Sequence, residues 1–323
     1  MIFFHGCVLM DLDDKIYIAG HNGMVGSAIL RALKEKGHDN FILKSHNELD
    51  LTVQSDVRDF FNKEKPDIVF LAAAKVGGIR ANIENPVSFL MDNIIIQHNV
   101  ISTAFDNDVE KLIFLGSSCI YPTQAQQPLK EEYLLTGPLE PTNEGYALSK
   151  IVGLKACEYY NKQYGTNYVG VMPPNLYGIN DNFDLKTAHV VASLIKKMHI
   201  AKINDEPEVE IWGSGNQYRE LMFVDDMADA TLYAADHYNG DSFINIGVGV
   251  DYTIRELSET IQKVVGYDGE LFFDTSKPDG MFRKVLDVSN FNELGWKSKI
   301  SLEKGLSLTY DWFLENECGD MND

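Results

Sequence analysis

A tyrosine and a lysine four positions apart, Tyr146 and Lys150, are the side chains best suited to chemistry. Residues at this spacing share one face of a helix, so the phenol and the ammonium can converge on one bound group. A nearby ammonium stabilises the phenolate, and the pair is then an acid that works near neutral pH. Ser117, at the end of an expected strand, can hydrogen-bond the same carbonyl oxygen. These three side chains predict the reduction of a ketone by a nicotinamide cofactor.

A glycine-spaced loop near the start of the chain predicts where that cofactor binds. Gly20, Gly23 and Gly26 are separated by two residues each, between an expected strand at 16–19 and an expected helix at 27–36. In this context the glycines let backbone N–H groups and a helix N-terminus approach a pyrophosphate. Each signal is common by itself. The order of glycine loop, strand-end serine and Tyr-Lys helix is rarely produced by chance.

Strand and helix patterns alternate over the first half of the chain, and they must position these residues. Strands are expected at 16–19, 41–43, 68–71, 111–115 and 168–172, and helices at 27–36, 55–63, 87–105 and 146–163. Such alternation indicates βαβ units and a parallel sheet, with ligand-contacting groups at the carboxyl ends of the strands. The predicted fold class is α/β, with a Rossmann-type doubly wound parallel sheet.

The second half of the chain is smaller and mixed, and it begins after a loop at 173–178. Helices are expected at 188–200, 224–238 and 253–265, and strands at 208–212 and 242–246. We expect a tail at 1–14, an NAD(P)-binding domain at 15–178 and a mainly substrate-binding domain at 179–323, some segments of which return to the first domain. Since no long linker separates the two domains, they should pack directly and hold ligands in the cleft between them.

Composition excludes several classes of protein. The 323 residues are 45% hydrophobic, which supports a large core, and the formal net charge of -20 argues against nucleic-acid or anionic-membrane partners. Four scattered cysteines and eight histidines show no metal motif and suit the cytoplasm. The apolar start at 1–9 is too short to span a bilayer and lacks a basic region. Met10, just before the first expected strand, is an alternative start of translation.

The end of the second expected strand bears on which nicotinamide cofactor is used. An acid about 20 residues past the glycines holds the free ribose 2′-OH of NAD, whereas a base meets the extra phosphate of NADP. This strand ends in Lys44, Ser45, His46 and Asn47, without an acid at its tip. The residues favour NADP, with NADPH as hydride donor, and leave NADH as the alternative.

Long runs of sequence resemble the GDP-L-fucose synthases, which are GDP-4-keto-6-deoxy-D-mannose 3,5-epimerase 4-reductases of the extended short-chain dehydrogenase/reductase family. The resemblance covers about residues 15–316 and rests on the runs at 20–26, 72–78, 116–122, 140–144, 175–178, 212–215 and 276–280. It implies an NADP-dependent oxidoreductase that also epimerises its substrate, and a homodimer built on helices of the nucleotide domain.

The resemblance implies a role for two further residues. Ser117, Tyr146 and Lys150 would form the reductase triad, with Cys119 and His189 as base and acid for epimerisation at C3 and C5. A ketone at C4 acidifies the protons on both neighbouring carbons, and a thiol and an imidazole suit their exchange near neutral pH. Without the resemblance, Cys119 would be a small buried residue and His189 a surface or core histidine.

The resemblance also assigns the binding residues. For the substrate GDP-4-keto-6-deoxy-D-mannose it implies Lys197, Trp212, Arg219 and Lys284, although Trp212 alone would suit a core and Lys197 a solvated helix face. For the cofactor it implies a longer set that includes the glycine loop: Gly20, Asn22, Gly23, Met24, Val25, Gly26, Lys44, His46, Asp50, Leu51, Leu115, Gly116, Ser118, Lys150, Pro173, Asn175, Leu176 and His189.

Some departures and alternatives stay open from the sequence. Well-known members carry arginine at the positions of Asn22 and His46, where it meets the 2′-phosphate, so Lys44 or a protonated His46 would have to substitute. A 4-epimerase that recycles a bound NAD would give Cys119 no role. A 4,6-dehydratase would need an acidic pair where Ser118 and Cys119 stand. A non-catalytic nucleotide-sensing module would not need an intact Tyr-Lys pair.

Overall fold

The computed structural model describes residues 9–240, 242–277 and 281–318. Residues 1–8 of the expected tail, with Cys7, lie outside the described residues, as do residues 278–280 of the matched run at 276–280. Within the described residues, no helix is long and apolar enough to cross a membrane.

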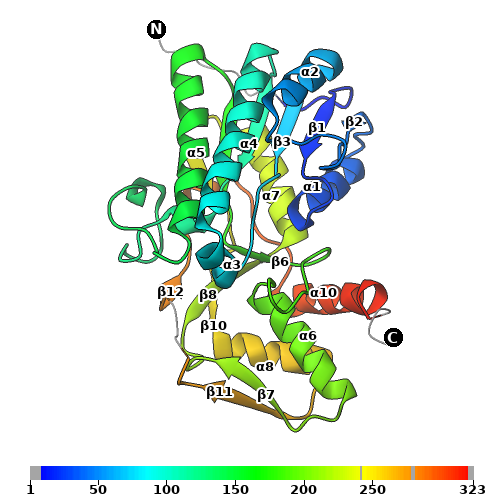
Figure 1. Cartoon of the computed structure of the whole chain (residues 1–323), viewed down its shortest axis with the longest axis vertical. Coiled ribbons are helices and arrows are strands. Elements are labelled where there is room, and N and C mark those ends of the chain that lie inside the picture. Colours follow the sequence, from blue (N-terminus) through cyan, green and yellow to red (C-terminus); the bar gives the residue numbers. More distant parts are fainter. Residues whose placement is uncertain (1–8, 241, 278–280, 319–323) are drawn as a thin grey trace.

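A six-stranded parallel sheet forms the larger lobe, in the order β2-β1-β3-β4-β5-β9 (Figure 1). The chain moves from β1 to β2 on one side and returns to β3 on the other, so the doubly wound topology predicted from the sequence is confirmed. The strands are β1 (Ile16–Ala19), β2 (Phe41–Ile42), β3 (Ile68–Leu71), β4 (Lys111–Leu115), β5 (Tyr168–Met172) and β9 (Phe243–Asn245).

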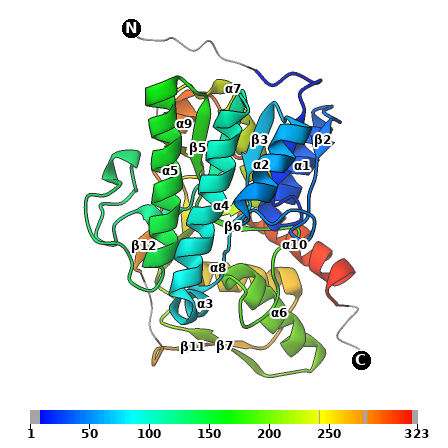
Figure 2. The ribbon, with the colours of Figure 1, turned by 45° about the horizontal axis from the view of Figure 1, so that its top comes forward.

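Helices cover both faces of this sheet, which is why its strands are apolar on both sides. Ile16 and Ile18 pack with the helices of one face, and Tyr17 and Ala19 with those of the other. The first face carries α1 (Met24–Glu35) and α7 (Val224–His237). The second carries α2 (Gln54–Glu64), α4 (Pro86–Asp106) and α5 (Glu144–Tyr164), of which α4 and α5 run side by side (Figures 1 and 2).

Two segments from beyond residue 178 belong physically to the larger lobe. β9 pairs in parallel with β5, and α7 packs along α1, where the Arg31 guanidinium and the Asp225 carboxylate form an ion pair. The chain therefore crosses from one lobe to the other several times. The assignment of substrate binding to the region 179–323 stays a prediction.

The smaller lobe has its own core, packed between helices and short strands at the lower end of Figure 1. Its central strand, β8 (Tyr218–Phe223), pairs with β6 (Asn175–Tyr177), β10 (Asp251–Thr253) and β12 (Arg283–Lys284), while β7 (Glu208–Trp212) pairs with β11 (Glu270–Asp274). The helices are α6 (Val190–Ile203), α8 (Ile254–Val265) and α10 (Leu302–Asn316).

The structure corrects two boundaries predicted from the sequence. The expected loop at 173–178 contains β6, because Asn175 to Tyr177 pair with β8. The helix expected from 188 begins at Val190, with His189 as its N-cap. The short elements α3 (Ile79–Glu84), α9 (Ser289–Glu293), η1 (Ser118–Ile120) and η2 (Glu131–Tyr133) complete the fold.

Candidate active site

Lys150 is fixed at the end of the sheet by a backbone carbonyl. Its Nζ atom donates a hydrogen bond of 2.7 Å to the carbonyl oxygen of Leu115, the last residue of β4. The same ammonium lies 5.0 Å from the centre of the Phe114 ring and 5.8 Å from that of Tyr146. Because α5 packs against β4 and β5, it brings the Tyr-Lys pair to the strand end that precedes Ser117.

Burial governs the pKa values of the pair. It lowers the pKa of Lys150 to about 8, and it raises the pKa of the Tyr146 phenol, to which a negative charge on Cys119 would add. A hydrogen bond with Ser117 opposes the rise in the tyrosine. Desolvation of the phenolate is the largest effect on this pKa, so the phenol stays protonated and has a proton to donate. The stabilisation of the phenolate by the Lys150 ammonium stays a prediction.

Cys119 lies in the same cluster, one short turn beyond Ser117. Its backbone N–H donates to the Ser117 hydroxyl at 3.5 Å, and its residue is only 8% exposed. Burial raises the pKa of the thiol, while the ammoniums of Lys284 and Lys150 and a hydrogen bond with Ser117 lower it. The structure thus brings together Ser117, Cys119, Tyr146 and Lys150, and adds Lys284 from the smaller lobe.

His189 is the N-cap residue of α6, and its side chain does not cap the helix. The residue has an exposed surface, yet surrounding protein lowers the pKa of its imidazole, as does the Lys284 ammonium. A group that is accessible to solvent but partly desolvated is typical of the wall of a cleft. The imidazole is neutral near pH 7, so it can accept a proton there.

Arg219 and Lys284 form a pair of cations on neighbouring strands. Lys284 of β12 is directly opposite Arg219 of β8 in the parallel register. Burial is the first cause that lowers the pKa of each side chain, and the charge of Arg219 adds to the effect on Lys284. Among the described residues, neither side chain forms an ion pair with a carboxylate. Two adjacent, partly buried cations that form no ion pair within the described residues suit a diphosphate.

Trp212 and Lys197 lie farther out on the smaller lobe. Trp212, at the end of β7, is 61% exposed, and Lys277 Nζ is 5.6 Å from the centre of its ring. Lys197 Nζ on α6 donates to the carbonyl oxygen of Glu210 at 3.4 Å. Exposure excludes a core role for Trp212 and leaves its ring open to a planar ligand group.

A cavity of about 640 Å³ lies at the carboxyl ends of β1 and β3, where the strand order reverses. Gly20 has φ +89°, and a Cβ there would lie 2.8 Å from the backbone N of Ala73, while a Cβ at Gly26 would overlap the carbonyl oxygen of Gly20. This close backbone cradle fits a dinucleotide. The lining includes these predicted residues: Gly20, Asn22, Gly23, Met24, Val25, Gly26, Lys44, His46, Asp50 and Leu51.

The remaining predicted cofactor residues lie nearer the Ser117 cluster. Leu115 is the last residue of β4, Gly116 and Ser118 follow it, and the Gly116 N–H donates to the carbonyl oxygen of Val171 at 2.8 Å. The other predicted residues that do not line the large cavity are Pro173, Asn175, Leu176, Lys150 and His189. Strand-end residues of this kind would meet the nicotinamide end of a dinucleotide that starts at the glycine loop.

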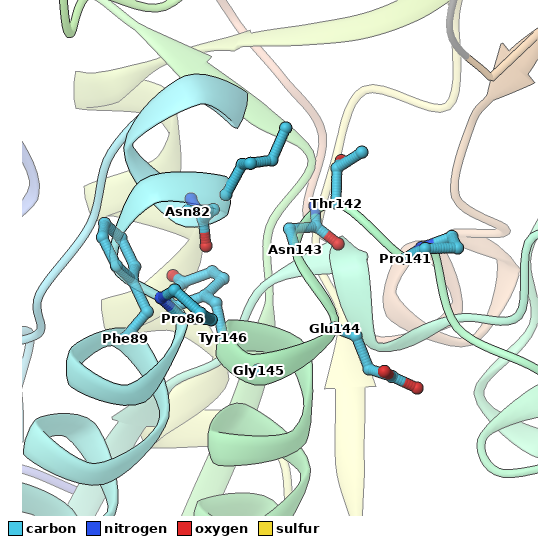
Figure 3. Close-up of a pocket in the computed structure, with 10 residues that line it drawn as sticks. Asn82, Pro86, Phe89, Pro141, Thr142, Asn143, Glu144, Gly145 and Tyr146 are labelled. Carbon is cyan, nitrogen blue, oxygen red and sulfur yellow. The ribbon is translucent and has the colours of Figure 1, made fainter.

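A second cavity of about 230 Å³ lies beside Tyr146, between α3 and the start of α5 (Figure 3). Asn82, Ile83 and Phe89 line one side of it, and Pro141 to Tyr146 line the other. Sequence reasoning assigned none of these residues except Tyr146. The run 140–144 contributes to the family resemblance, but the resemblance assigns it no chemical role.

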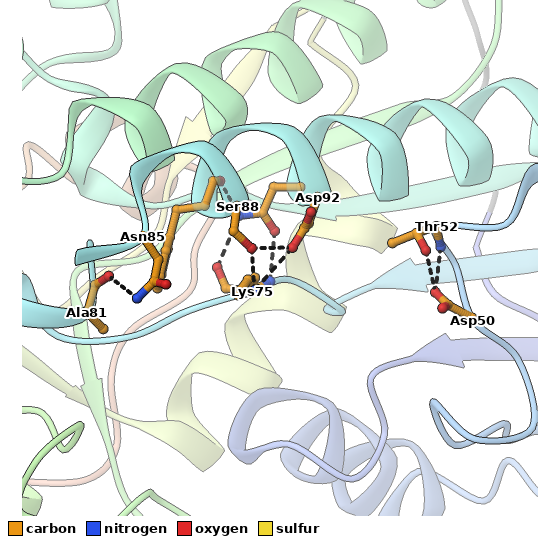
Figure 4. A network of polar contacts seen from close by, with 9 residues as sticks. Asp50, Thr52, Lys75, Ala81, Asn85, Ser88 and Asp92 are labelled. Carbon is orange, nitrogen blue, oxygen red and sulfur yellow. Dashed lines mark hydrogen bonds and ion pairs between the residues drawn. The ribbon is translucent and has the colours of Figure 1, made fainter. Parts of the chain in front are cut away.

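The loop after β3 lines the large cavity and is fixed by a buried amide. Asn93 accepts a hydrogen bond of 2.7 Å from the backbone N of Lys75 and donates one of 3.0 Å to its carbonyl oxygen. Lys75 Nζ also contacts the Ser88 hydroxyl and lies 3.1 Å from the Asp92 carboxylate (Figure 4). Sequence reasoning missed residues 72–76 as lining, although the strand-end rule could have found them.

A doubly wound sheet with a Ser-Tyr-Lys cluster beside a dinucleotide cavity is typical of a carbonyl reductase of the short-chain dehydrogenase type. Residues 16–247 match the NAD dependent epimerase/dehydratase family. The chain is 52% identical over 311 residues to "Putative GDP-L-fucose synthase 2" of Arabidopsis thaliana, covering 96% of this chain and 95% of that protein.

Two further likenesses narrow the class. The chain is 52% identical to the GDP-L-fucose synthase of Escherichia coli (strain K12), covering 94% of this chain and 97% of that protein. It superposes on a crystal structure of a GDP-L-fucose synthetase from Naegleria fowleri bound to NADP with a TM-score of 0.90 at 28% identity, covering 96% and 95% of the two chains. The chain belongs to the NAD dependent epimerase/dehydratase family and, within it, to the GDP-L-fucose synthase group. The resemblance noted in the sequence is confirmed.

Proposed function

We propose that the chain epimerises GDP-4-keto-6-deoxy-D-mannose at C3 and C5 and then reduces C4 with NADPH to give GDP-L-fucose. One observation carries this proposal: Cys119 lies in the same buried cluster as Ser117, Tyr146 and Lys150. A reductase alone has no use for a thiol there. The identity of about half of all residues to GDP-L-fucose synthases supports the same reaction.

Epimerisation needs one group that removes a proton and another that returns it on the opposite face. The C4 carbonyl makes the C3 and C5 protons acidic, and hydrogen bonds from Ser117 and Tyr146 to its oxygen stabilise the enolate. In the free protein Cys119 is a neutral thiol and His189 a neutral imidazole. The proton of the Cys119 thiol passes to the neutral His189 imidazole, so that Cys119 becomes a thiolate base, stabilised by Lys284 and Lys150, and His189 becomes the acid. His189, once protonated, donates to the other face.

Reduction of C4 follows at the same bound sugar. NADPH, when bound in the glycine-loop cavity, supplies the hydride to C4. Tyr146 donates its proton to the carbonyl oxygen, and Ser117 hydrogen-bonds that oxygen while charge develops on it. Lys150, fixed on the Leu115 carbonyl, keeps a positive charge near the phenolate that remains. One hydride and one proton thus convert the ketone to an alcohol.

The smaller lobe would anchor the nucleotide. Arg219 and Lys284 present paired cations for the diphosphate, and the exposed ring of Trp212 offers a stacking surface for guanine, with Lys197 nearby. Lys44 and His46 line the cofactor cavity at the expected place of the 2′-phosphate. Lys44 lies 3.6 Å from Glu48, so part of its charge is already compensated.

The partner in solution would be a second copy of the chain, bound through α4 and α5. Apolar side chains stay exposed along both helices: Val87, Met91 and Ile95 on α4, and Leu148, Val152 and Tyr159 on α5. Their spacing of mostly four residues gives each helix an apolar stripe. Val152→Lys would place a charge in this stripe, and sedimentation should then show a monomer where the parent is a dimer.

A cytoplasmic location fits Cys119, Cys157 and Cys318, which are free thiols.

The direct test supplies the purified protein with GDP-4-keto-6-deoxy-D-mannose and NADPH. We expect oxidation of one NADPH per sugar and a product identical to GDP-L-fucose by NMR. No NADPH oxidation and no fucose nucleotide would remove the proposal. Turnover of a bound cofactor without net NADPH consumption would instead support a 4-epimerase.

A further inference from the structure

The cavity of about 230 Å³ beside Tyr146 contains polar atoms that the reaction described above does not use. Its walls combine the apolar side chains of Ile83, Pro86, Phe89 and Pro141 with polar groups, and Figure 3 shows the Asn82 carboxamide between α3 and the tyrosine ring. The Tyr146 ring meets Phe89 edge-on, with ring centres 6.4 Å apart. Polar groups beside apolar walls can orient a small ligand.

Asn82 uses only half of its side chain inside the protein. Its Nδ2 donates to the carbonyl oxygens of Gly77 at 2.9 Å and Gly78 at 3.1 Å. Its Oδ1 is buried and has no hydrogen-bond partner among the described residues, and the residue is 5% exposed. Leaving a buried acceptor unpaired is costly, because it has lost water without gaining a protein donor.

Asn143 repeats the pattern on the opposite wall. It is the N-cap of α5, a position where asparagine usually accepts a hydrogen bond from the first turn, but its side chain makes no such bond. Its Oδ1 is also buried without a partner in the described part of the chain. Asn82 and Asn143, each with an unpaired carboxamide oxygen, therefore line one small cavity together with Tyr146.

The cavity also adjoins the segment that leads to His189. A Cβ at Gly78 would lie 3.6 Å from the carbonyl oxygen of Thr187 and 3.7 Å from that of Ala188. Asn82 holds Gly78 through its Nδ2 atom, so it stands between Tyr146 and the start of α6. Tyr146 and His189, which lie at these two places, are the proposed proton donors to the sugar.

We propose that Asn82 is a substrate-positioning residue whose Oδ1 accepts a hydrogen bond from the C3 hydroxyl of the keto sugar. This inference rests on the proposed function. When Tyr146 donates to the C4 oxygen, the hydroxyl on the neighbouring carbon is the closest donor that the substrate offers. Asn143 Oδ1 is a second acceptor in the same cavity. Since both atoms are neutral acceptors, they select a hydroxyl rather than an anion.

The test compares the keto sugar with its 3-deoxy analogue, using NADPH oxidation as readout. For the parent protein we expect kcat/KM to be about tenfold lower with the analogue, the usual effect of one hydrogen bond. Asn82→Ala should lower kcat/KM for the full substrate about tenfold and make the two substrates nearly equal. A merely structural role of Asn82 would lower both substrates alike and keep their ratio. Asn85→Ala, which removes an exposed carboxamide at the end of the same helix, is the matched control and should keep both values.

Persistence of the tenfold ratio in Asn82→Ala would overturn the inference, as would an unchanged kcat/KM. If that variant loses its folded circular dichroism spectrum, Asn82→Ser is measured with the same two substrates and the same criterion. A parent protein that reduces neither sugar would instead overturn the proposed function. The two failures are therefore distinguishable.

Discussion

The larger and the smaller lobe each contribute one wall of the candidate site, and the two walls differ in how firmly they hold their functional groups. The wall from the larger lobe places Ser117, Cys119 and Lys150 at the end of β4 and on α5, mostly buried and joined by hydrogen bonds. The wall from the smaller lobe presents the half-buried Arg219 and the exposed Trp212 on short strands. Rigid burial favours proton and hydride chemistry, whereas more accessible cations and rings favour recognition.

Because of this difference, we expect substitutions in the two walls to change different kinetic constants. Changes in the buried wall should lower kcat, because its groups act mainly in the transition state, and changes in the exposed wall should raise KM. The following substitutions test that division.

Tyr146→Phe should have the largest effect. It removes the proton donor for C4, so kcat for NADPH oxidation should fall on the order of a thousandfold, with KM little changed. Tyr164→Phe, on the same helix but packed against Phe105, is the control and should keep the parent rate. A drop of less than about tenfold in Tyr146→Phe would contradict the assigned role.

Arg219→Ala should act mainly through KM, because Arg219, unlike Lys284, has no part in stabilising the Cys119 thiolate. Loss of a charged hydrogen bond to the diphosphate costs about 2 kcal/mol, which corresponds to a rise of about thirtyfold in KM for the GDP-sugar. Lys299→Ala, which breaks an exposed ion pair with Asp229, should leave KM unchanged. If kcat falls and KM does not, this cation of the smaller lobe contributes to the chemical step rather than to substrate binding.

The pH dependence of reduction should reflect Lys150. Burial lowers its pKa to about 8, so the ammonium is present at pH 7 and is lost as pH rises through 8. We expect kcat/KM for NADPH oxidation to fall about tenfold per pH unit above 8. Proton exchange at C3 and C5, which needs a deprotonated Cys119, should instead increase with pH over the same range. A flat profile to pH 10 would exclude Lys150 as the controlling group.

Lys44→Ala should have the smallest effect. Lys44 is partly exposed and shares its charge with Glu48, so we expect KM for NADPH to rise about fivefold, with little change for NADH. Lys63→Ala, a more exposed lysine beside Glu64, serves as control. An equal loss with both cofactors would mean that Lys44 does not meet the 2′-phosphate.

The larger lobe was predictable from the sequence because its signals are local. β3, β4 and β5 lie at the residues that the apolar runs predicted, since strands buried on both faces are continuously hydrophobic. β8 was not predicted, because its sequence mixes Arg219 and Glu220 with apolar residues. Glu220 is nevertheless buried, since backbone N–H groups of Val248, Gly249 and Leu286 donate to its carboxylate. Such tertiary compensation leaves no periodic signal.

The functional site was likewise predictable only where the sequence signal is local. The strand-end rule found Ser117 and the glycine loop, because both follow directly from local sequence. His189 and Lys284 came only from a resemblance, because the position of Lys284 near both Cys119 and His189 depends on how the two lobes pack. Asn82 and Asn93 were missed because a buried amide on a helix has the same sequence signal as a solvated one.

Two chemistries that share one cluster can be separated by Cys119→Ser. The variant is given the keto sugar and NADPH in D₂O, and NMR follows both deuterium at C3 and C5 and the configuration of the reduced product. We expect deuterium uptake to fall about a hundredfold or more, while slow reduction at C4 continues without inversion at C3 and C5. Uptake at the parent rate, or a normal GDP-L-fucose product, would show that Cys119 is not the base.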